Sequence, residues 1–283
     1  MVRSKVAALI ASLILATQAL AGPEPSLLLF VGAASKPPTE EAIGAFEKQA
    51  GTGVDAIYGG SGYVLSQMVL AGRGDVYFPG SSDYMAKAKR ENRVDPTTER
   101  TVVYLVPAIN VRRGNPKGIR SLKDLTRPGL RVAMANPASV CVGVYAVETV
   151  ERNLDRKEKA LLRRNIVNFT ESCEKTATAV SLGAVDAVLG WSVFEHWDPK
   201  RIETVKLKPA EITRVGYIPV AVARCSNSPE RAKAFISFLT SAEGRRIFAS
   251  HHYFLTPEEA FAYIGEKKPV GGEYTVPSEW LVK

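Results

Sequence analysis

The sequence predicts an α/β protein of two lobes, each built on a mostly parallel β-sheet flanked by helices. Three observations support this prediction. Short apolar runs alternate with segments of helical spacing, the loops between them are rich in Gly and Ser, and two longer apolar runs are placed to cross between the lobes. Open sheets of this kind bind ligands beyond the carboxyl ends of their strands, so the loops at those ends are the candidate site.

The N-terminal part of the chain begins with this alternation. Leu27 to Val31 is a continuous apolar run typical of a buried parallel strand, and a helix is expected from about Thr39. The pattern is then repeated by a strand at 54–58, the loop GGSG, a helix to about residue 71 and a strand at 75–78. Consecutive strand, helix and strand units favour a parallel sheet.

A second set of elements of the same kind predicts a second lobe. Its strands are expected at 130–134, 166–169 and 186–190, with one helix from about residue 142 and another up to about residue 182. Long apolar runs at 101–111 and 214–223 stand on either side of this set. The chain is therefore expected to cross between the lobes twice, with these two runs as hinge strands.

The first 21 residues predict an export signal. Arg3 and Lys5 precede an apolar run, and Ala19-Leu20-Ala21 offers small residues for cleavage near Ala21. An uncleaved anchor is the alternative, but an apolar run of about eleven residues is too short to span a bilayer. The expected organisation is a signal peptide at 1–21, one lobe at 22–104 with 216–255, the other at 105–215, and an extension at 256–283 that wraps loosely around a lobe.

Composition excludes several classes of protein. A chain of 283 residues with 46% hydrophobic and 23% charged residues suits one large or two medium globular domains. The formal charge of +8 is scattered along the chain, and the basic residues lack interleaved aromatic residues, so no nucleic-acid groove is expected. We expect an exported, periplasmic monomer without a nucleic-acid partner.

Catalytic and metal sites are not predicted. The three histidines are His196, His251 and His252, and none has a sequence context that suggests a nucleophile with its base. Adjacent histidines near the end of a helix point to different faces, and no clear third ligand is nearby. We therefore expect a binding protein that is not an enzyme and needs no cofactor.

Two serines follow neighbouring strands at the turn into a helix. Ser35 comes after the first strand, and Ser61 lies in the GGSG loop after the second. Free N–H groups at a helix N-terminus point at a bound anion, and a serine hydroxyl adds one more donor. The alternative is that each serine only caps its helix, as serine commonly does. An anion site and a pair of caps both remain open.

Trp191 closes the apolar run DAVLGW, which is the last strand expected in the second lobe. The residue then lies at a carboxyl edge of the sheet. It either packs in the core or lines the cleft, and the sequence leaves both interpretations open.

In order along the chain, these motifs resemble the periplasmic molybdate- and tungstate-binding proteins of ABC uptake systems. The resemblance runs from about residue 27 to 254 and rests on FVGAASK, GGSGYVLSQMVLAGRGDVYFPGSSDYM, NPASVCVGVYAVE, AVDAVLGW and YIPVAV. It implies a type II solute-binding protein whose two lobes close on a tetrahedral oxyanion. Serine hydroxyls and backbone N–H groups hold the anion in that family, and no cationic side chain is required.

The resemblance also implies which residues bind. The first serine of the family matches Ser35, and the second falls at Ser61 or one residue on, at Gly62. Two backbone donors of the second lobe match Val142, next to Cys141, and Cys173. The tyrosine that the family places after its last second-lobe strand matches Trp191, which departs from the pattern because an indole offers an N–H and no hydroxyl.

Cys141 and Cys173 are therefore both expected at the mouth of the anion site, whereas Cys225 is expected away from it. Three interpretations remain open. The pair forms a disulfide in an oxidising compartment, or it binds a soft ligand such as arsenite or a cuprous ion, or the two residues merely pack beside an ordinary oxyanion.

The function that the resemblance implies is periplasmic capture of a small tetrahedral oxyanion, with molybdate or tungstate expected, and its delivery to the membrane permease of an ABC transporter. The alternative keeps the fold but changes the role. In that hypothesis the protein is a sensor or carrier of a thiophilic species, bound by Cys141 and Cys173, and presents it to a receptor.

Overall fold

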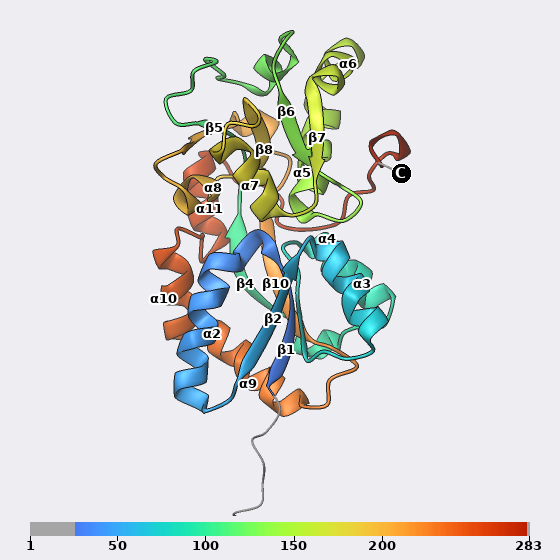
Figure 1. Cartoon of the computed structure of the whole chain (residues 1–283), viewed down its shortest axis with the longest axis vertical. Coiled ribbons are helices and arrows are strands. Elements are labelled where there is room, and N and C mark those ends of the chain that lie inside the picture. The colour runs from blue at the N-terminus through green and yellow to red at the C-terminus, as the bar shows by residue number, and fades with distance from the viewer. Residues whose placement is uncertain (1–25, 282–283) are drawn as a thin grey trace, which may run out of the picture.

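The computed structural model describes residues 26–281, which form two lobes placed one above the other (Figure 1). The expected export signal lies outside the described residues. Each lobe contains a five-stranded sheet with helices packed against it, so the expected two-lobed α/β fold is confirmed. Within the described range, no helix is long and apolar enough to cross a membrane.

The first lobe contains the N-terminal elements and the segment that returns from the second lobe. Its strand order is β2 (Val54–Gly59), β1 (Leu27–Gly32), β3 (Val76–Phe78), β10 (Gly216–Val222) and β4 (Arg100–Leu105). Its helices are α2 (Lys36–Ala50), α3 (Ser61–Ala71), α4 (Ser82–Arg90), α9 (Pro229–Leu239) and α10 (Ala242–Ser250). Short 3₁₀ turns lie at Ala33–Ser35 and Pro96–Thr98.

The second lobe repeats this plan. Its strand order is β7 (Ile166–Thr170), β6 (Val132–Ala135), β8 (Ala187–Trp191), β5 (Pro107–Arg112) and β9 (Ile202–Val205). Its helices are α5 (Cys141–Asn153), α6 (Arg156–Asn165), α7 (Cys173–Ser181) and α8 (Phe194–Trp197), with 3₁₀ turns at Leu122–Thr126 and Pro209–Glu211.

Both sheets are mixed, because one strand in each runs against the other four. β10 is antiparallel to β3 and β4, and β5 is antiparallel to β8 and β9. The remaining pairings, of β1 with β2 and β3 and of β6 with β7 and β8, are parallel. The reversed strands are those that follow a crossing between the lobes.

Two expected elements have different bounds in the structure. The apolar run 101–111 is not one strand: it divides at Val106 into β4 and β5, which belong to different lobes. The first helix begins at Lys36 and not near Thr39. Pro37 and Pro38 fit in its first turn, because the backbone N–H groups there have no partner within the helix and proline lacks this group.

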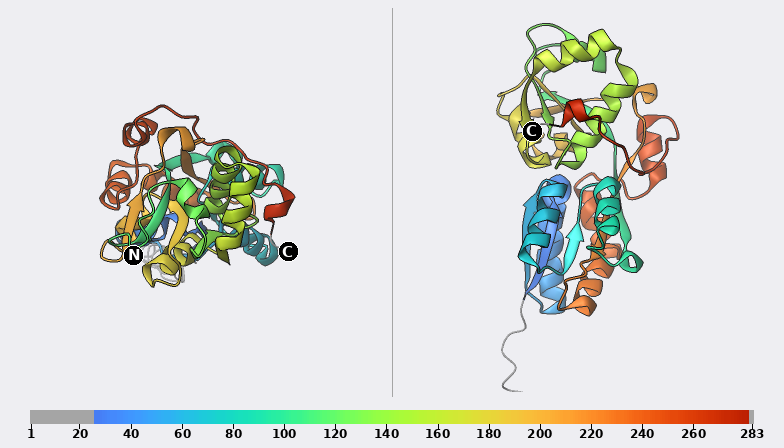
Figure 2. Two further views of the ribbon diagram at one scale, coloured as in Figure 1. Left: turned by 90° about the horizontal axis from the view of Figure 1, so that it is seen from above. Right: turned by 90° about the vertical axis from the view of Figure 1, so that its right-hand side faces the viewer.

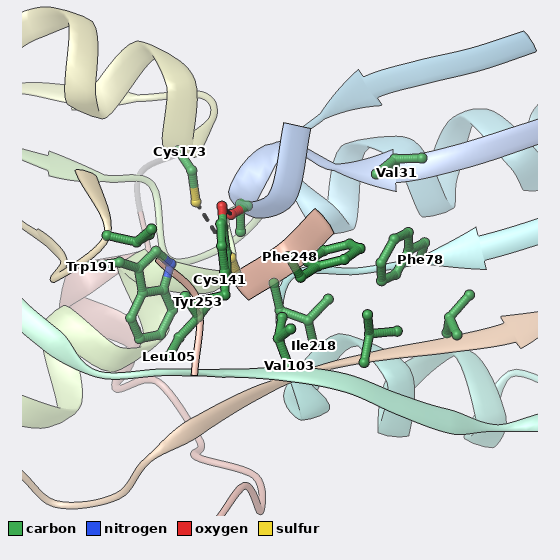
Figure 3. Close-up of a cluster of buried hydrophobic side chains, with 14 of the residues drawn as sticks. Val31, Phe78, Val103, Leu105, Cys141, Cys173, Trp191, Ile218, Phe248 and Tyr253 are labelled. Atoms are coloured by element: carbon green, nitrogen blue, oxygen red, sulfur yellow. Dashed lines mark hydrogen bonds between the residues drawn. The ribbon is translucent and has the colours of Figure 1, made fainter. Parts of the chain in front are cut away.

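The lobes are in contact, and the structure is therefore the closed form. The Gly62 N–H donates to the Ser139 carbonyl (2.8 Å), and the Tyr84 hydroxyl donates to the Pro137 carbonyl (3.2 Å). The Lys36 ammonium pairs with Glu174 of α7 at 2.9 Å. Apolar side chains continue across this junction, where Phe78 and Phe248 of the first lobe belong to the same buried cluster as Trp191 of the second (Figure 3).

The C-terminal extension reaches both lobes instead of wrapping loosely around one. It contains α11 (Pro257–Ile264) and a 3₁₀ turn at Ser278–Trp280, and Figure 2 shows its last turn beside the second lobe. On the first lobe, the Ser82 hydroxyl donates to the Gly272 carbonyl (2.7 Å). On the second, the Trp280 indole donates to Glu151 (2.7 Å). The extension thus bridges the two lobes beside the hinge.

Candidate functional site

The first lobe presents its two serines at the carboxyl ends of β1 and β2. Ser35 ends the 3₁₀ turn before α2, and Ser61 is the first residue of α3; the two are 0% and 1% exposed. The Ser35 Oγ accepts a hydrogen bond from the Thr39 hydroxyl (3.2 Å), and the Ser61 Oγ accepts one from the Gly80 N–H (2.9 Å). Neither hydroxyl caps its own helix, so capping does not explain these serines.

The second lobe presents two helix starts and a strand end at one edge of its sheet. α5 begins at Cys141 and Val142, α7 begins at Cys173, and β8 ends at Trp191. These elements follow or belong to the parallel strands β6, β7 and β8, and parallel strands place their carboxyl ends at the same edge. All four residues are at most 1% exposed.

Gly80, in the loop after β3, brings the two halves together. A Cβ built on this glycine would lie 2.5 Å from the Cys141 Sγ and 2.7 Å from the Ala34 Cβ. The Gly80 N–H is also the group that donates to Ser61. The first serine loop, the second serine loop and the start of α5 therefore meet around one residue that has no side chain.

Gly62 lies at the junction of the lobes, whereas Ser61 contacts the Gly80 loop. The Gly62 N–H is engaged with Ser139 across the lobe junction, and a Cβ on Gly62 would lie 2.8 Å from the Tyr84 ring. Of the two positions that the resemblance offered for the second serine, Ser61 is the one that contacts the Gly80 loop, and Gly62 forms the lobe contact.

The thiols of Cys141 and Cys173 face one another with their sulfurs 3.5 Å apart, and both cysteines are free (Figure 3). Burial raises the pKa of the Cys173 thiol well above its usual range, and Cys141 raises it further; the Val142 N–H and the Trp191 indole N–H act in the opposite direction. Cys225 is partly exposed, and its sulfur lies 3.6 Å from the Gly74 carbonyl in the first lobe, apart from the pair.

Trp191 packs its ring against Tyr145 of α5, with ring centroids 4.8 Å apart. Its indole nitrogen lies close enough to the Cys173 sulfur to lower the pKa of that thiol, but by distance and angle it has no hydrogen-bond partner in the described part of the chain. The buried Tyr145 hydroxyl also has no hydrogen-bond partner among the described residues. Trp191 is thus both a core residue and a buried donor at the site edge.

Sequence reasoning missed Gly80 and Ser81 of the third first-lobe loop. The Ser81 side chain is fully buried, and its hydroxyl has no hydrogen-bond partner among residues 26–281. The signal was available in the motif FPGSSD, a third loop of Gly and Ser at the end of a strand. No local pattern, however, indicated that Gly80 would touch Cys141.

Two of the three histidines stack on one another, and the third pairs with a carboxylate. His196 stacks on His252 with ring centroids 3.7 Å apart, and His251 pairs with Glu41. Across residues 26–281, no group of three His, Cys, Asp or Glu side chains is arranged to hold a metal ion.

A groove of about 660 Å³ opens beside the junction of the lobes and is lined by residues of both. Gly60 and Gly62 lie on its first-lobe side, with Ser139 and Ser172 opposite. A Cβ on Gly60 would lie 2.7 Å from both the Glu171 and the Ser139 carbonyl oxygens. The residues that line the groove do not include Ser35, Ser61, Cys141 or Cys173.

The family model and the similar proteins are all binding proteins. The model of the bacterial extracellular solute-binding proteins matches residues 27–254. A protein named only as a binding protein, from Haemophilus influenzae, is 27% identical over 232 residues, which cover 80% of this chain and 90% of that protein. The molybdate-binding protein ModA of Mycobacterium bovis is 27% identical over 199 residues, 70% of this chain and 72% of that protein.

A solved structure has the same fold. The sulfate-binding protein SubI of Mycobacterium tuberculosis aligns with a TM-score of 0.72 at 22% identity, over 87% of this chain and 93% of that one. The family model covers both lobes, and the solved structure has the same two-lobed fold. The chain therefore belongs to the bacterial extracellular solute-binding proteins.

Proposed function

We propose that this protein captures a small tetrahedral oxyanion, molybdate or tungstate, in the periplasm and delivers it to the permease of an ABC transporter. The observation that carries the proposal is the meeting of buried neutral donors from both lobes. The hydroxyls of Ser35 and Ser61 come from one side, and the helix starts at Val142 and Cys173 come from the other. Helix N-termini bind anions through their N–H groups and their dipole.

The donor set favours an anion that carries no proton. Backbone N–H groups and the Trp191 indole can only donate. The Ser35 and Ser61 Oγ atoms already accept from Thr39 and Gly80, which leaves the hydroxyl hydrogens to donate to the ligand. Molybdate, tungstate and sulfate need only donors, whereas hydrogen phosphate also needs an acceptor. Relatives named for molybdate and for sulfate support this choice of ligand class.

The proposal includes the organisation expected from the sequence: export with cleavage near Ala21, lobes at 22–104 with 216–255 and at 105–215, and action as a monomer. A sensor or carrier of a thiophilic solute is the rival function on the same fold. The ligands named for the matched relatives, molybdate and sulfate, are oxyanions. This favours uptake of an oxyanion over transport of a thiophilic solute.

Thermal unfolding of the mature protein tests the ligand. Molybdate or tungstate at about a hundred times its Kd is expected to add about 2.7 kcal/mol to the free energy of unfolding, because it binds only the folded state. Sulfate and hydrogen phosphate at the same concentration are the comparison ions. An unchanged midpoint with molybdate and with tungstate would contradict the proposal.

Gly60→Ala is expected to weaken ligand binding by about 5- to 150-fold, because forcing a methyl group into a packed contact costs about 1–3 kcal/mol. The new Cβ meets the carbonyls of Glu171 and Ser139 only when the lobes are closed. The Gly60 backbone (φ −60°, ψ 142°) suits alanine, so the first lobe itself is not strained. Titration calorimetry measures the change in affinity.

Gly44→Ala is the matched control, since a Cβ there has no neighbour within 4 Å. This variant is expected to bind like the wild type. Equal affinities for Gly60→Ala and Gly44→Ala would show that ligand binding does not require the closed contact seen here.

A further inference from the structure

The cysteine pair has a chemistry that oxyanion capture does not use. An anion held by hydroxyls and backbone N–H groups needs no thiol, yet Cys141 and Cys173 are the first residues of α5 and α7, the two helices that face the first lobe. Their sulfurs come within 3.5 Å although 32 positions separate them, and each residue is 1% exposed. Two buried thiols at this distance can act together as donors to one soft ligand.

We propose that Cys141 and Cys173 form a dithiol site, in the same cleft, for a trivalent thiophilic oxyacid, with arsenite as its probe. The inference deepens the proposed function and rests on it for one property, a cleft that opens to admit a small oxygen-containing solute and then closes. The ligand would bind through two sulfurs of the second lobe.

The distance between the sulfurs selects the geometry of the ligand. With bonds to sulfur of about 2.3 Å, a centre with an S–X–S angle near 100° joins sulfurs about 3.5 Å apart, whereas a linear centre needs about 4.6 Å. The observed 3.5 Å fits the bent arrangement of trivalent arsenic. A linear cuprous ion would require the helix starts at Cys141 and Cys173 to move apart by about 1 Å.

Charge favours the same ligand. Burial raises the pKa of the Cys173 thiol, so this thiol is held neutral, and arsenous acid is itself neutral at pH 7. Each thiol displaces one hydroxyl from As(OH)₃. Two As–S bonds form and two As–O bonds break, and the two thiol protons leave with the displaced hydroxyls as two molecules of water. No group is oxidised or reduced, and no net charge is left in the buried site.

Trp191 supplies a third contact. Arsenic bound to two sulfurs keeps one hydroxyl, which can accept a hydrogen bond. The Trp191 indole N–H is fully buried, lies beside the Cys173 sulfur and has no hydrogen-bond partner in the described residues. Figure 3 shows its nitrogen on the side of the ring that faces the cysteines. The donor is therefore in place for the remaining hydroxyl.

Access to the thiols depends on the lobes. The Cys141 sulfur lies against the Gly80 loop of the first lobe, where even a single added Cβ would come within 2.5 Å of it. The closed form therefore covers the pair, and separation of the lobes uncovers it. Binding of arsenite would leave both sulfurs enclosed and protected from other thiol reagents.

The test uses the mature protein, reduced with a phosphine because thiol reductants compete for arsenite. Sodium arsenite is expected to raise the unfolding midpoint and to remove two of the three titratable thiols, with one arsenic per chain by mass spectrometry. Cys141→Ser and Cys173→Ser are each expected to lose the midpoint shift. Cys225→Ser, whose thiol lies apart from the pair, keeps it and leaves no titratable thiol in the arsenite complex.

Two results would overturn the inference: no arsenite response in the reduced wild type, or a Cys141–Cys173 disulfide in the protein as isolated from the periplasm, which uses up both thiols. Molybdate added to the same reduced wild type separates this inference from the proposed function. Response to molybdate alone rejects the dithiol site and keeps oxyanion capture. Response to arsenite alone keeps the dithiol site and rejects molybdate as the solute.

Discussion

Replacement of Arg214 by leucine is expected to destabilise the protein by about 3–5 kcal/mol, because it leaves the buried Asp83 carboxylate without its cation and breaks the buried pair with Glu148. The Arg214 guanidinium is 5% exposed and donates to Glu148 (2.7 Å) and to both oxygens of Asp83 (2.8 and 3.2 Å). It also donates to the carbonyls of Gly271 and Gly272. One side chain thus joins α4 of the first lobe, α5 of the second and the C-terminal extension.

Arg152→Leu is the matched control, since Arg152 is 60% exposed and pairs with the same Glu148 at 3.3 Å. It removes the same charge and is expected to cost less than about 1 kcal/mol, as exposed ion pairs do. Urea unfolding followed by tryptophan fluorescence measures both variants. Equal losses for Arg214→Leu and Arg152→Leu would mean that the buried network contributes no more than a surface pair.

Ser35→Ala and Ser61→Ala are each expected to weaken molybdate binding by about 1.5–3 kcal/mol, which is roughly 10- to 150-fold in Kd, because each removes a hydrogen bond to a charged partner. Both hydroxyls are buried at the carboxyl ends of β1 and β2 and neither caps a helix. Titration calorimetry at fixed ionic strength gives the two affinities.

Ser237→Ala, on an exposed position of α9, is the control and is expected to leave Kd unchanged. Unaltered affinity in both Ser35→Ala and Ser61→Ala would exclude these serines from the site. Loss in Ser61→Ala alone would place the anion at the Gly80 loop, since the Ser61 Oγ is the one bonded to the Gly80 N–H.

Local patterns determined the elements and the edge at which they present the site. Apolar runs and helical spacing predicted most of the strands and helices, because a buried strand or helix face requires apolar residues at a regular spacing in the sequence. The position of Ser35, Ser61 and Trp191 after strands was enough to place them at carboxyl ends. The resemblance added the match of Val142 and Cys173 to helix starts, where the structure has both residues.

Contacts between distant segments were decided only by the tertiary structure. The break of the run 101–111 at Val106 and the reversal of β10 follow from which lobe each half joins, and an apolar run has the same composition in either direction. The buried network of Arg214 could not be predicted either, because its partners lie 66 and 131 positions away.

The site shows the same division. The family resemblance of the sequence predicted that serines, helix starts and two cysteines would face one cleft. Only the folded chain decided that the thiols lie 3.5 Å apart, that Gly80 contacts both Cys141 and the first serine loop, and that Gly62 belongs to the lobe contact. Such distances depend on how two helices and three loops from separate lobes pack together, and non-local packing leaves no periodic signal in the local sequence.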